Sequence, residues 1–288
     1  MPSKRLFDRH VGDAFLAGVP AAPGVYRVHD EAGELVYVGK AKNLKRRLAQ
    51  YRDAGRRKRH AKMRDIVRAA RHIEFEACPS HLEACLLEAK LIREHRPRFN
   101  VAGAYHFLYQ FLGLRQNSGD LALCYTTRPD DFPDYSPHGA YRSRQATRDA
   151  FWALVKLLRY LAPAERPSSE PVPRYSFVRS FRKPAGTWLA PLTRFLRGDD
   201  TDALRELVLA LLAKPAARRH AKEVEASLFA LRTFRADEIA PLARARARTG
   251  YAAWPVPQAE RDPLFLRAKY ADDERAAWRQ ARKTHNLS

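Results

Sequence analysis

The chain has 288 residues, with 53 Lys or Arg against 32 Asp or Glu, which gives a formal net charge of +21. A hydrophobic content of 45% excludes a disordered chain, and the length is that of about two domains. No apolar run approaches the ~20 residues of a membrane span, and no apolar segment follows the first charged residues. We therefore expect neither a transmembrane helix nor a signal peptide.

The positive charge is concentrated in one segment. Residues 40–71 hold 14 Lys or Arg against two acids, Asp53 and Asp65. Like charges at this density repel one another unless something neutralises them, so a polyanion is the first expected partner and a membrane surface the second. Of the two we expect a nucleic acid, DNA, and no membrane. An ordinary solvated surface remains the alternative for the excess over the whole chain.

The three cysteines indicate a reducing compartment. Cys78, Cys85 and Cys124 have no CxxC spacing. This pattern suggests neither a disulfide framework nor a cysteine metal site, and it agrees with a cytoplasmic protein.

The N-terminal third predicts a helix followed by a β-hairpin. Residues 1–19 read as a helical lead-in, which the prolines of segment 20–23 end. Alternating apolar residues then flank the polar run 30–34, as in a hairpin with a longer turn. Counting out from this turn places Tyr26 and Tyr37 nearly opposite each other on one face.

The next elements are two helices and a strand. Asn43 is a predicted N-cap for a helix through Tyr51, and a second helix is expected to end near Ala70. Residues 72–77 alternate as a third strand would. The residues expected to be buried are Leu44, Leu48, Tyr51, Ile73, Phe75 and Ala77.

A further helix carries an isolated carboxylate. Ser80 and Glu83 form a capping box for a helix to about His95, with Pro97 beyond its end. Glu88 lies among apolar residues of this helix, where an ionised carboxylate is costly without a partner. A metal ion is one such partner. A salt bridge to Arg47 or Arg93 is the ordinary alternative.

The remaining elements are predicted from short-range patterns. Strand-like runs surround Leu108 and Leu123, a Pro- and Gly-rich loop covers 132–141, and a helix spans about Thr147 to Leu161. The later expectations are a linker at 162–173, two short strands within 175–189, two helices in 201–248 interrupted near Pro215, and a charged helix from about Asp272.

One set of motifs resembles a known family. The segment Gly24-Val25-Tyr26 is followed, eleven residues from tyrosine to tyrosine, by Tyr37-Val38-Gly39-Lys40. This resembles the GIY-YIG nucleases. The continuation AKNLKRRL, with the later LLEAKLI and PRFN, is similar to the excision-repair nucleases UvrC and Cho. The strong part of the resemblance covers residues 20–105, and a weaker part reaches about 160.

The resemblance implies an α/β (α+β) fold. A GIY-YIG nuclease domain has a small central three-stranded antiparallel sheet flanked by helices, and a mainly helical C-terminal region would follow it here. The expected segments are a helical lead-in at 1–19, the nuclease domain at 20–105, a UvrC-like extension at 106–162, a linker with short strands at 163–190, a helical region at 191–250 and a basic, aromatic tail at 251–288.

The resemblance also implies catalytic roles. Tyr37 would take a proton from water, and because a free phenol has a pKa near 10, it needs positive charge nearby, such as Lys40 or a metal ion. Tyr26 would orient the water or the phosphate, or share the proton transfer. Glu88 would bind one Mg²⁺ or Mn²⁺ ion, with waters at the other positions.

The other matching residues would hold the substrate. Arg47 would bind the scissile phosphate, Tyr51 would contact the phosphate or support Arg47, and Asn100 would fix geometry near the second strand. Without the motif, tyrosines on strands are most often packing residues and Lys40 and Arg47 ordinary surface charges. The expected DNA-binding residues are Lys42, Lys45, Arg46, Arg56, Arg57, Lys58 and Arg59.

The resemblance predicts a metal-dependent DNA endonuclease that hydrolyses a phosphodiester bond in one strand, by a single-sided incision in nucleotide excision repair. The cysteines that hold an iron–sulfur cluster in UvrC have no counterpart, so no such cluster is expected. The family's pattern for binding UvrB is not evident in 201–248, which leaves UvrB, or UvrB with DNA, an open partner. The rivals are a structure-specific or mobile-element nuclease of the same fold and a catalytically silent DNA-binding scaffold.

Overall fold

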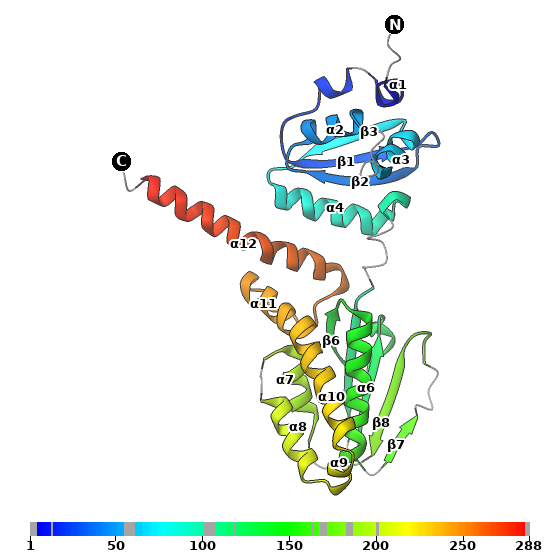
Figure 1. Cartoon of the computed structure of the whole chain (residues 1–288), viewed down its shortest axis with the longest axis vertical. Coiled ribbons are helices and arrows are strands. Elements are labelled where there is room, and N and C mark those ends of the chain that lie inside the picture. The colour runs from blue at the N-terminus through cyan, green and yellow to red at the C-terminus, as the bar shows by residue number, and fades with distance from the viewer. Residues whose placement is uncertain are drawn as a thin grey trace. The chain divides into compact units, whose positions relative to one another are not determined.

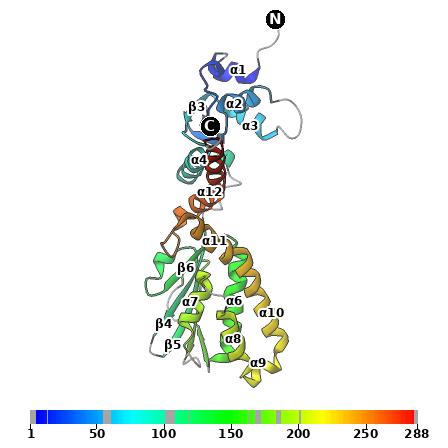
Figure 2. The ribbon, with the colours of Figure 1, turned by 90° about the vertical axis from the view of Figure 1, so that its left-hand side faces the viewer.

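The computed structural model describes residues 5–12, 14–54, 61–100, 108–117, 119–162, 164–167, 172–182, 187–199 and 202–285. The chain divides into two compact units, Met1–Phe107 and Leu108–Ser288 (Figures 1 and 2). No described helix is both long and apolar enough to cross a membrane.

The first unit is a three-stranded antiparallel sheet with helices on both faces (Figure 1). The strand order is β2-β1-β3, and the small three-stranded antiparallel sheet that the resemblance implies for the nuclease domain is confirmed. Its elements are α1 (Leu6–Val11), a 3₁₀ turn (Phe15–Ala17), β1 (Gly24–His29), β2 (Leu35–Ala41), α2 (Leu44–Arg52), α3 (Ala61–Ala69), β3 (His72–Ala77), α4 (His81–His95) and a second 3₁₀ turn (Arg98–Asn100).

Local signals set the helix starts. The Asn43 side chain accepts a hydrogen bond from the backbone N–H of Arg46 at 2.8 Å and so caps α2. Ser80 caps α4 in the same way, through the N–H of Glu83 at 3.1 Å. Both predicted N-caps are confirmed.

The core of the first unit lies on both faces of the sheet. On one face, Tyr26 of β1 packs with Leu44, Leu48 and Tyr51 of α2 and with Ile66 of α3. The other face packs against α4 through a smaller cluster, whose buried members are Val25, Val38, Ala84 and Leu91. The predicted apolar stripe of α2 is therefore buried as expected.

Two predictions for the sheet are wrong. Tyr26 pairs with Gly39, and Tyr37 pairs with Val28, so the two tyrosines are diagonal neighbours on adjacent strands. An irregularity next to the turn, between Val28 and His29, sets this register. Ala77, expected inside, is exposed at the end of β3, which is an edge strand.

The second unit is built on a five-stranded antiparallel sheet of order β6-β4-β5-β8-β7. Its elements are β4 (Gln110–Gln116), β5 (Asp120–Thr126), a 3₁₀ turn (Pro129–Asp131), β6 (Ser136–Tyr141), α6 (Arg144–Leu161), β7 (Ala164–Pro167), β8 (Phe177–Arg182), α7 (Leu189–Arg197), α8 (Ala203–Leu212), α9 (Pro215–Arg219), α10 (Ala221–Phe234), a π-helical turn (Arg235–Ile239), α11 (Ala240–Thr249) and α12 (Gln258–His285).

Helix α6 is the centre of the second unit's core. It packs across β4, β5 and β8 and along α10. Its buried residues include the predicted helical stripe Phe151, Leu154, Val155 and Leu158, which is confirmed. Figure 2 shows α6, α8 and α10 on one side of the strands of this unit.

The helical C-terminal region is confirmed, but several predicted elements of the second unit are wrong. Residues 132–141 were expected to be a loop, yet 136–141 form β6, an edge strand, where proline is tolerated. The linker at 162–173 contains β7, and 175–189 holds one described strand, β8. Helix α12 begins at Gln258 and continues past Pro263, because Leu264 and Ala268 pack into the core.

Candidate active site

Three tyrosines meet on the α2 face of the first unit's sheet. The Tyr26 ring centre lies 6.0 Å from that of Tyr37, and its hydroxyl is 3.0 Å from the hydroxyl of Tyr51. Tyr26 and Tyr51 are buried, 1% and 3% exposed, whereas Tyr37 is only half-buried. Tyr37 is therefore the phenol of this cluster that water can reach.

Gly39 permits this close approach. A Cβ atom at this position would lie 2.5 Å from both Cζ and the hydroxyl oxygen of Tyr26, and 2.9 Å from Cε1 of Tyr37. Real Cβ contacts are not that short. The glycine of the YVG motif is thus required by the two tyrosine rings that flank it.

Burial keeps two of the three phenols neutral. It raises the pKa of Tyr26 above its ordinary value, and the nearby Tyr37 adds to this effect while Arg47 opposes it. Burial likewise raises the pKa of Tyr51. At neutral pH these two phenols are hydrogen-bonding groups and poor bases.

Arg47 is held against the phenols. Its Nε donates to the Tyr26 hydroxyl at 3.3 Å, and its Nη1 donates to Oε1 of Gln50 at 3.0 Å. Its Cζ lies 5.3 Å from the centre of the Tyr51 ring. The guanidinium is therefore positioned by side chains of β1 and α2 before any phosphate arrives.

Glu88 of α4 is paired with Lys40 of β2. The Lys40 backbone N–H donates to Oε1 of Glu88 at 3.2 Å, and the Lys40 ammonium forms an ion pair with Oε2. The Glu88 side chain is 16% exposed and that of Lys40 is 36% exposed. The sequence suggested Arg47 or Arg93 as the ion-pair partner, and the Lys40 pairing corrects this expectation because β2 lies directly against α4.

The residues around Glu88 fit one hard divalent cation. Across the described parts of the chain, no group of three or more His, Cys, Asp and Glu is arranged to hold a metal. A single carboxylate completed by water is an arrangement that Mg²⁺ accepts. One carboxylate oxygen accepts from a backbone N–H and the other pairs with the Lys40 ammonium, and this partly exposed ammonium can turn toward water when a metal ion binds.

Asn100 completes the hydrogen bonds of the sheet edge. Its Oδ1 accepts from the backbone N–H of Val38 at 2.8 Å, and its Nδ2 donates to the Val38 carbonyl at 2.9 Å. The amide thus pairs with β2 as a neighbouring strand would. It fixes the strand between Tyr37 and Lys40.

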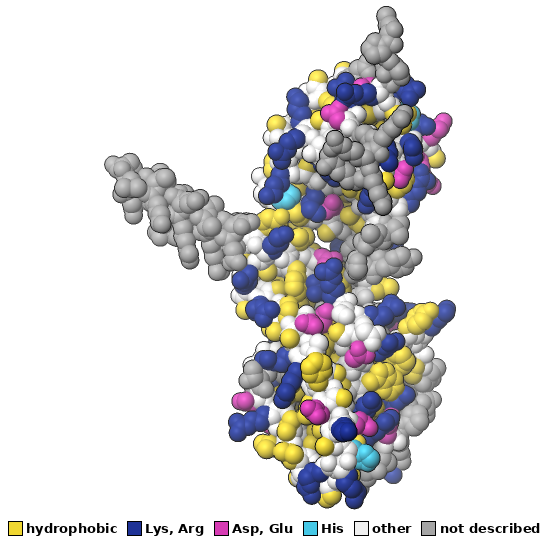
Figure 3. All heavy atoms as spheres, in the orientation of Figure 1, with side chains coloured by type: hydrophobic (Ala, Val, Ile, Leu, Met, Phe, Trp, Pro, Cys, Tyr) yellow, Lys and Arg dark blue, Asp and Glu magenta, His cyan; other side chains and the backbone are white. Residues whose placement is uncertain are grey.

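The predicted DNA-binding cations are only partly placed. Lys42, Lys45 and Arg46 are exposed around the start of α2. The run from Arg56 to Arg59 lies outside the described residues. Figure 3 shows Lys and Arg side chains, in dark blue, spread over the surface of the first unit.

Two residues near the site were missed. Lys62 of α3 places its Nζ 5.4 Å from the centre of the Tyr37 ring, a contact that no sequence spacing indicates. His81 lies two turns before Glu88 on α4, and this seven-residue spacing was an available signal. Burial lowers the pKa of His81, with further lowering by Lys42 and Lys40, so its imidazole is neutral.

Comparison with known proteins shows which family the residues of this site resemble. A sequence profile described as "UvrC-like GIY-YIG domain" matches residues 22–101. UvrABC system protein C of Cytophaga hutchinsonii is 37% identical over 143 residues, which are 50% of this chain and 24% of that protein. The corresponding protein of Bartonella henselae is 48% identical over 88 residues, 30% of this chain and 13% of that protein.

A longer sequence match and a solved structure are also similar to parts of this chain. The Protochlamydia amoebophila protein of the same name is 32% identical over 206 residues, 65% of this chain and 33% of that protein. The N-terminal endonuclease domain of Thermotoga maritima UvrC, solved with magnesium as its catalytic divalent cation, is 34% identical, with a TM-score of 0.27. The match covers 30% of this chain and 90% of the solved domain. The chain thus matches a third or less of each of these three curated relatives.

The profile match covers the part of the first unit that holds the sheet and the tyrosine cluster, which is thus a GIY-YIG domain by similarity. Within that class, residues 22–101 are a UvrC-like GIY-YIG domain.

Proposed function

We propose that the chain is a metal-dependent DNA endonuclease that hydrolyses one strand by attack of water on phosphorus. The observation that carries the proposal is that β2, the strand that Asn100 fixes, carries both Tyr37 of the tyrosine–Arg47 cluster and Lys40 of the Lys40–Glu88 pair. These groups supply a base, a phosphate ligand and a metal ligand, which are the parts that phosphodiester hydrolysis needs.

Tyr37 is the proposed general base. It is the accessible phenol of the cluster, and the Lys62 ammonium of α3 lies over its ring, where it would stabilise the phenolate that a base must be before it accepts a proton. The Tyr37 phenolate would take the proton of the attacking water and become a phenol. A divalent ion bound by Glu88 would neutralise charge on the phosphoryl oxygens and make water more acidic.

Arg47 is the proposed phosphate ligand. Tyr26 and Gln50 hold two of its guanidinium nitrogens, and the Tyr51 ring supports its plane. A guanidinium oriented in this way loses little freedom when it binds a phosphate. Burial and raised pKa values favour orientation, and not proton transfer, as the role of Tyr26 and Tyr51.

The proposal extends to the biological setting. Similarity to UvrABC system protein C favours nucleotide excision repair over a structure-specific or mobile-element target, with DNA as the partner and a cytoplasmic location. We propose that this catalytic arrangement makes a single-sided incision, as in Cho. Mg²⁺ or Mn²⁺ is the proposed cofactor, and UvrB, alone or on DNA, is the proposed loading partner.

The test is nicking of supercoiled plasmid, with and without ultraviolet damage, in Mg²⁺ or Mn²⁺. Glu88→Gln and Tyr37→Phe are expected to lower the nicking rate about 10²–10³-fold at unchanged DNA binding. Glu83→Gln, an exposed carboxylate on the same helix, is the matched control and should nick like the wild type.

Two outcomes would overturn the proposal. Equal nicking by the wild type and Glu88→Gln would remove Glu88 as the metal ligand. No nicking in either metal, with UvrB added and with DNA binding intact, would favour the silent DNA-binding scaffold. A preference for damaged plasmid would support the repair setting.

A further inference from the structure

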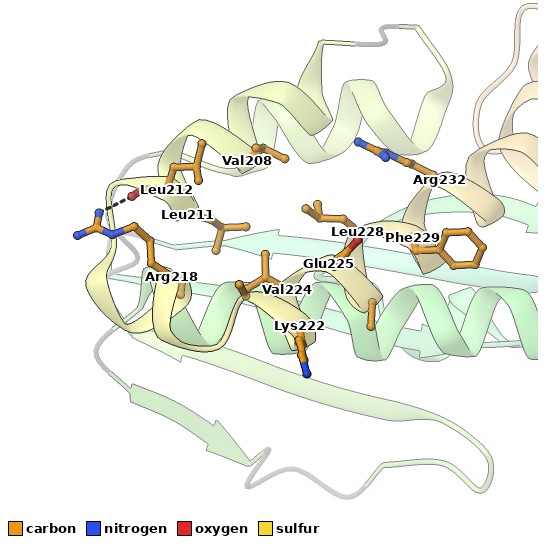
Figure 4. Close-up of a pocket in the computed structure, with 13 residues that line it drawn as sticks. Val208, Leu211, Leu212, Arg218, Lys222, Val224, Glu225, Leu228, Phe229 and Arg232 are labelled. Atoms are coloured by element: carbon orange, nitrogen blue, oxygen red, sulfur yellow. Dashed lines mark hydrogen bonds between the residues drawn. The ribbon is translucent and has the colours of Figure 1, made fainter.

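A groove runs between two helices of the second unit, and no residue of the proposed active site lines it. Its main cavity, of about 830 Å³, lies between α8 and α10 (Figure 4). Val208 and Leu211 extend from α8 toward Val224 and Leu228 of α10. The floor of the cavity is therefore apolar.

The groove continues beyond this cavity. A second hollow of about 440 Å³ shares Val208, Leu228 and Arg232 with the first and adds Leu204 and Leu209. The two together follow the length of α10, whose 14 residues span about 21 Å. This is the length of a helical segment of about four turns.

Large apolar side chains stand exposed along this groove. Leu209 is 58% exposed, Leu212 is 56% exposed and Phe229 is 70% exposed. Scattered exposed apolar residues need no explanation, but a contiguous group at a groove marks an interaction surface. Figure 3 shows hydrophobic side chains, in yellow, between cations on the surface of the second unit.

The rim of the groove is positive. Of the described residues that line the two hollows, the charged ones are Arg205, Arg218, Lys222, Glu225, Arg232 and Arg235. Arg232 projects over the gap between the helices, whereas Lys222 points away from it (Figure 4). Arg218 donates to the Leu212 carbonyl at 2.6 Å and fixes one end of the groove.

We propose that the α8–α10 groove binds an amphipathic, acidic α-helix of a partner protein. The apolar floor would take the leucine and aromatic face of such a helix, and the cationic rim would pair with its carboxylates. A DNA backbone satisfies the rim but leaves the floor and the exposed Phe229 unmatched. This binding site is independent of the proposed nuclease chemistry.

The direct test is fluorescence anisotropy of the full chain with a labelled designed peptide. The peptide has 18 residues, with Leu and Phe at positions i, i+3, i+4 and i+7 and Glu at the others. A scrambled peptide of the same composition and an ordered peptide with Lys in place of Glu are the controls. The acidic amphipathic peptide is expected to bind at least about tenfold more tightly than either.

Variants locate the binding. Phe229→Glu is expected to weaken binding about tenfold or more, and Arg232→Glu by several-fold. The matched controls are Tyr175→Glu, an equally exposed aromatic side chain, and Arg219→Glu, an exposed cation of α9 that does not line the groove. These four side chains are exposed, so tryptophan fluorescence should show each variant folded.

Four results would overturn the proposal. Equal binding of the scrambled peptide would reduce the interaction to charge attraction, and equal binding of the Lys peptide would exclude an acidic partner. A chain that sediments as a dimer and becomes monomeric in Phe229→Glu would assign the groove to a second copy. Weaker binding of a DNA fragment by Phe229→Glu, with no peptide binding, would make it a nucleic-acid surface.

Discussion

The cores of the two units of this protein contain different kinds of side chain. In the first unit, the core contains the hydroxyls of Tyr26 and Tyr51 and the edge of the Arg47 guanidinium. In the second unit, α6 buries Phe151 and Leu154 in a large apolar cluster. Buried polar groups are costly unless each is hydrogen-bonded, and the two units satisfy theirs differently. In the first unit Tyr26, Tyr51 and Arg47 bond to one another beside an accessible phenol, an arrangement suited to chemistry, whereas in the second unit the buried Glu238 bonds to backbone N–H groups and so supports the fold.

The four tryptophans allow the two units to be measured separately. Trp152, Trp188, Trp254 and Trp278 all belong to the second unit. Tryptophan fluorescence therefore follows the unfolding of that unit, while nicking follows the first. Each variant below is expected to change one signal and spare the other.

The largest contrast is expected from two glycines. Gly39→Ala should lower the nicking rate by more than about 10²-fold, because the new methyl group displaces Tyr26 and Tyr37. Gly113→Ala places a Cβ 2.4 Å from Sγ of Cys124 and should destabilise the second unit by about 2 kcal/mol. Denaturation followed by tryptophan fluorescence and plasmid nicking measure the two effects. Normal nicking by Gly39→Ala would contradict the tyrosine arrangement.

The next contrast compares two side chains, Glu238 and Asn100, that each form hydrogen bonds with backbone groups of another segment. Glu238 is buried and accepts from the backbone N–H groups of Arg142 and Ser143 at 2.6 and 2.9 Å. Glu238→Ala leaves both donors without this acceptor and should cost about 4 kcal/mol of unfolding free energy in the second unit. Asn100→Ala opens groups at a sheet edge that water can reach, so it should cost under about 1 kcal/mol but slow nicking about tenfold.

Urea denaturation followed by tryptophan fluorescence measures Glu238→Ala, and initial nicking rates measure Asn100→Ala. The separation of the two units by function would be broken if Glu238→Ala, while still folded, lost nicking to the same extent as Asn100→Ala.

A smaller effect is expected from pH. Burial, with some help from Arg197, lowers the pKa of His138 to about 4, and its Nδ1 accepts from Nε1 of Trp254 at 3.0 Å. Between pH 6.5 and 4 the unfolded chain binds more protons at this residue than the folded chain does. Stability of the second unit should therefore fall as the pH falls through this range, by up to about 3 kcal/mol.

Urea denaturation at pH 7, 5.5 and 4 measures the slope of the second unit's unfolding free energy against pH. His138→Gln, whose amide oxygen still accepts from Trp254, should flatten it. His72→Gln, an exposed histidine of the first unit, should leave it unchanged. An unchanged slope in His138→Gln would show that other groups cause the acid sensitivity.

The smallest effect is expected at Lys62. Its ammonium faces the Tyr37 ring, and exposed contacts of this kind contribute about 0.5–1 kcal/mol. Lys62→Gln should slow nicking only a few-fold, and Lys90→Gln, an exposed lysine of α4, should not slow it. Initial nicking rates in saturating metal separate the two. A loss as large as that of Tyr37→Phe would make Lys62 part of the catalytic centre.

Much of the first unit was predictable because its signals are short-range. The caps at Asn43 and Ser80 and the stop near Pro97 were each readable within a few residues. The second unit was harder to predict because its sheet joins strands far apart in the sequence, and β6 contains Pro137 and Gly139, which suggest a loop. Pairing with β4 at the sheet edge overrides that local preference.

The sequence by itself determined the UvrC-like GIY-YIG motifs, the helix that carries Glu88 and the positive charge, because these depend on residue identity and local spacing. Only the tertiary structure decided that Lys40 pairs with Glu88, that Tyr26 and Tyr37 are diagonal neighbours, and that α8 and α10 leave an apolar groove. Register, ion pairing and hollow surfaces arise from contacts between distant segments, and local sequence patterns do not specify these contacts.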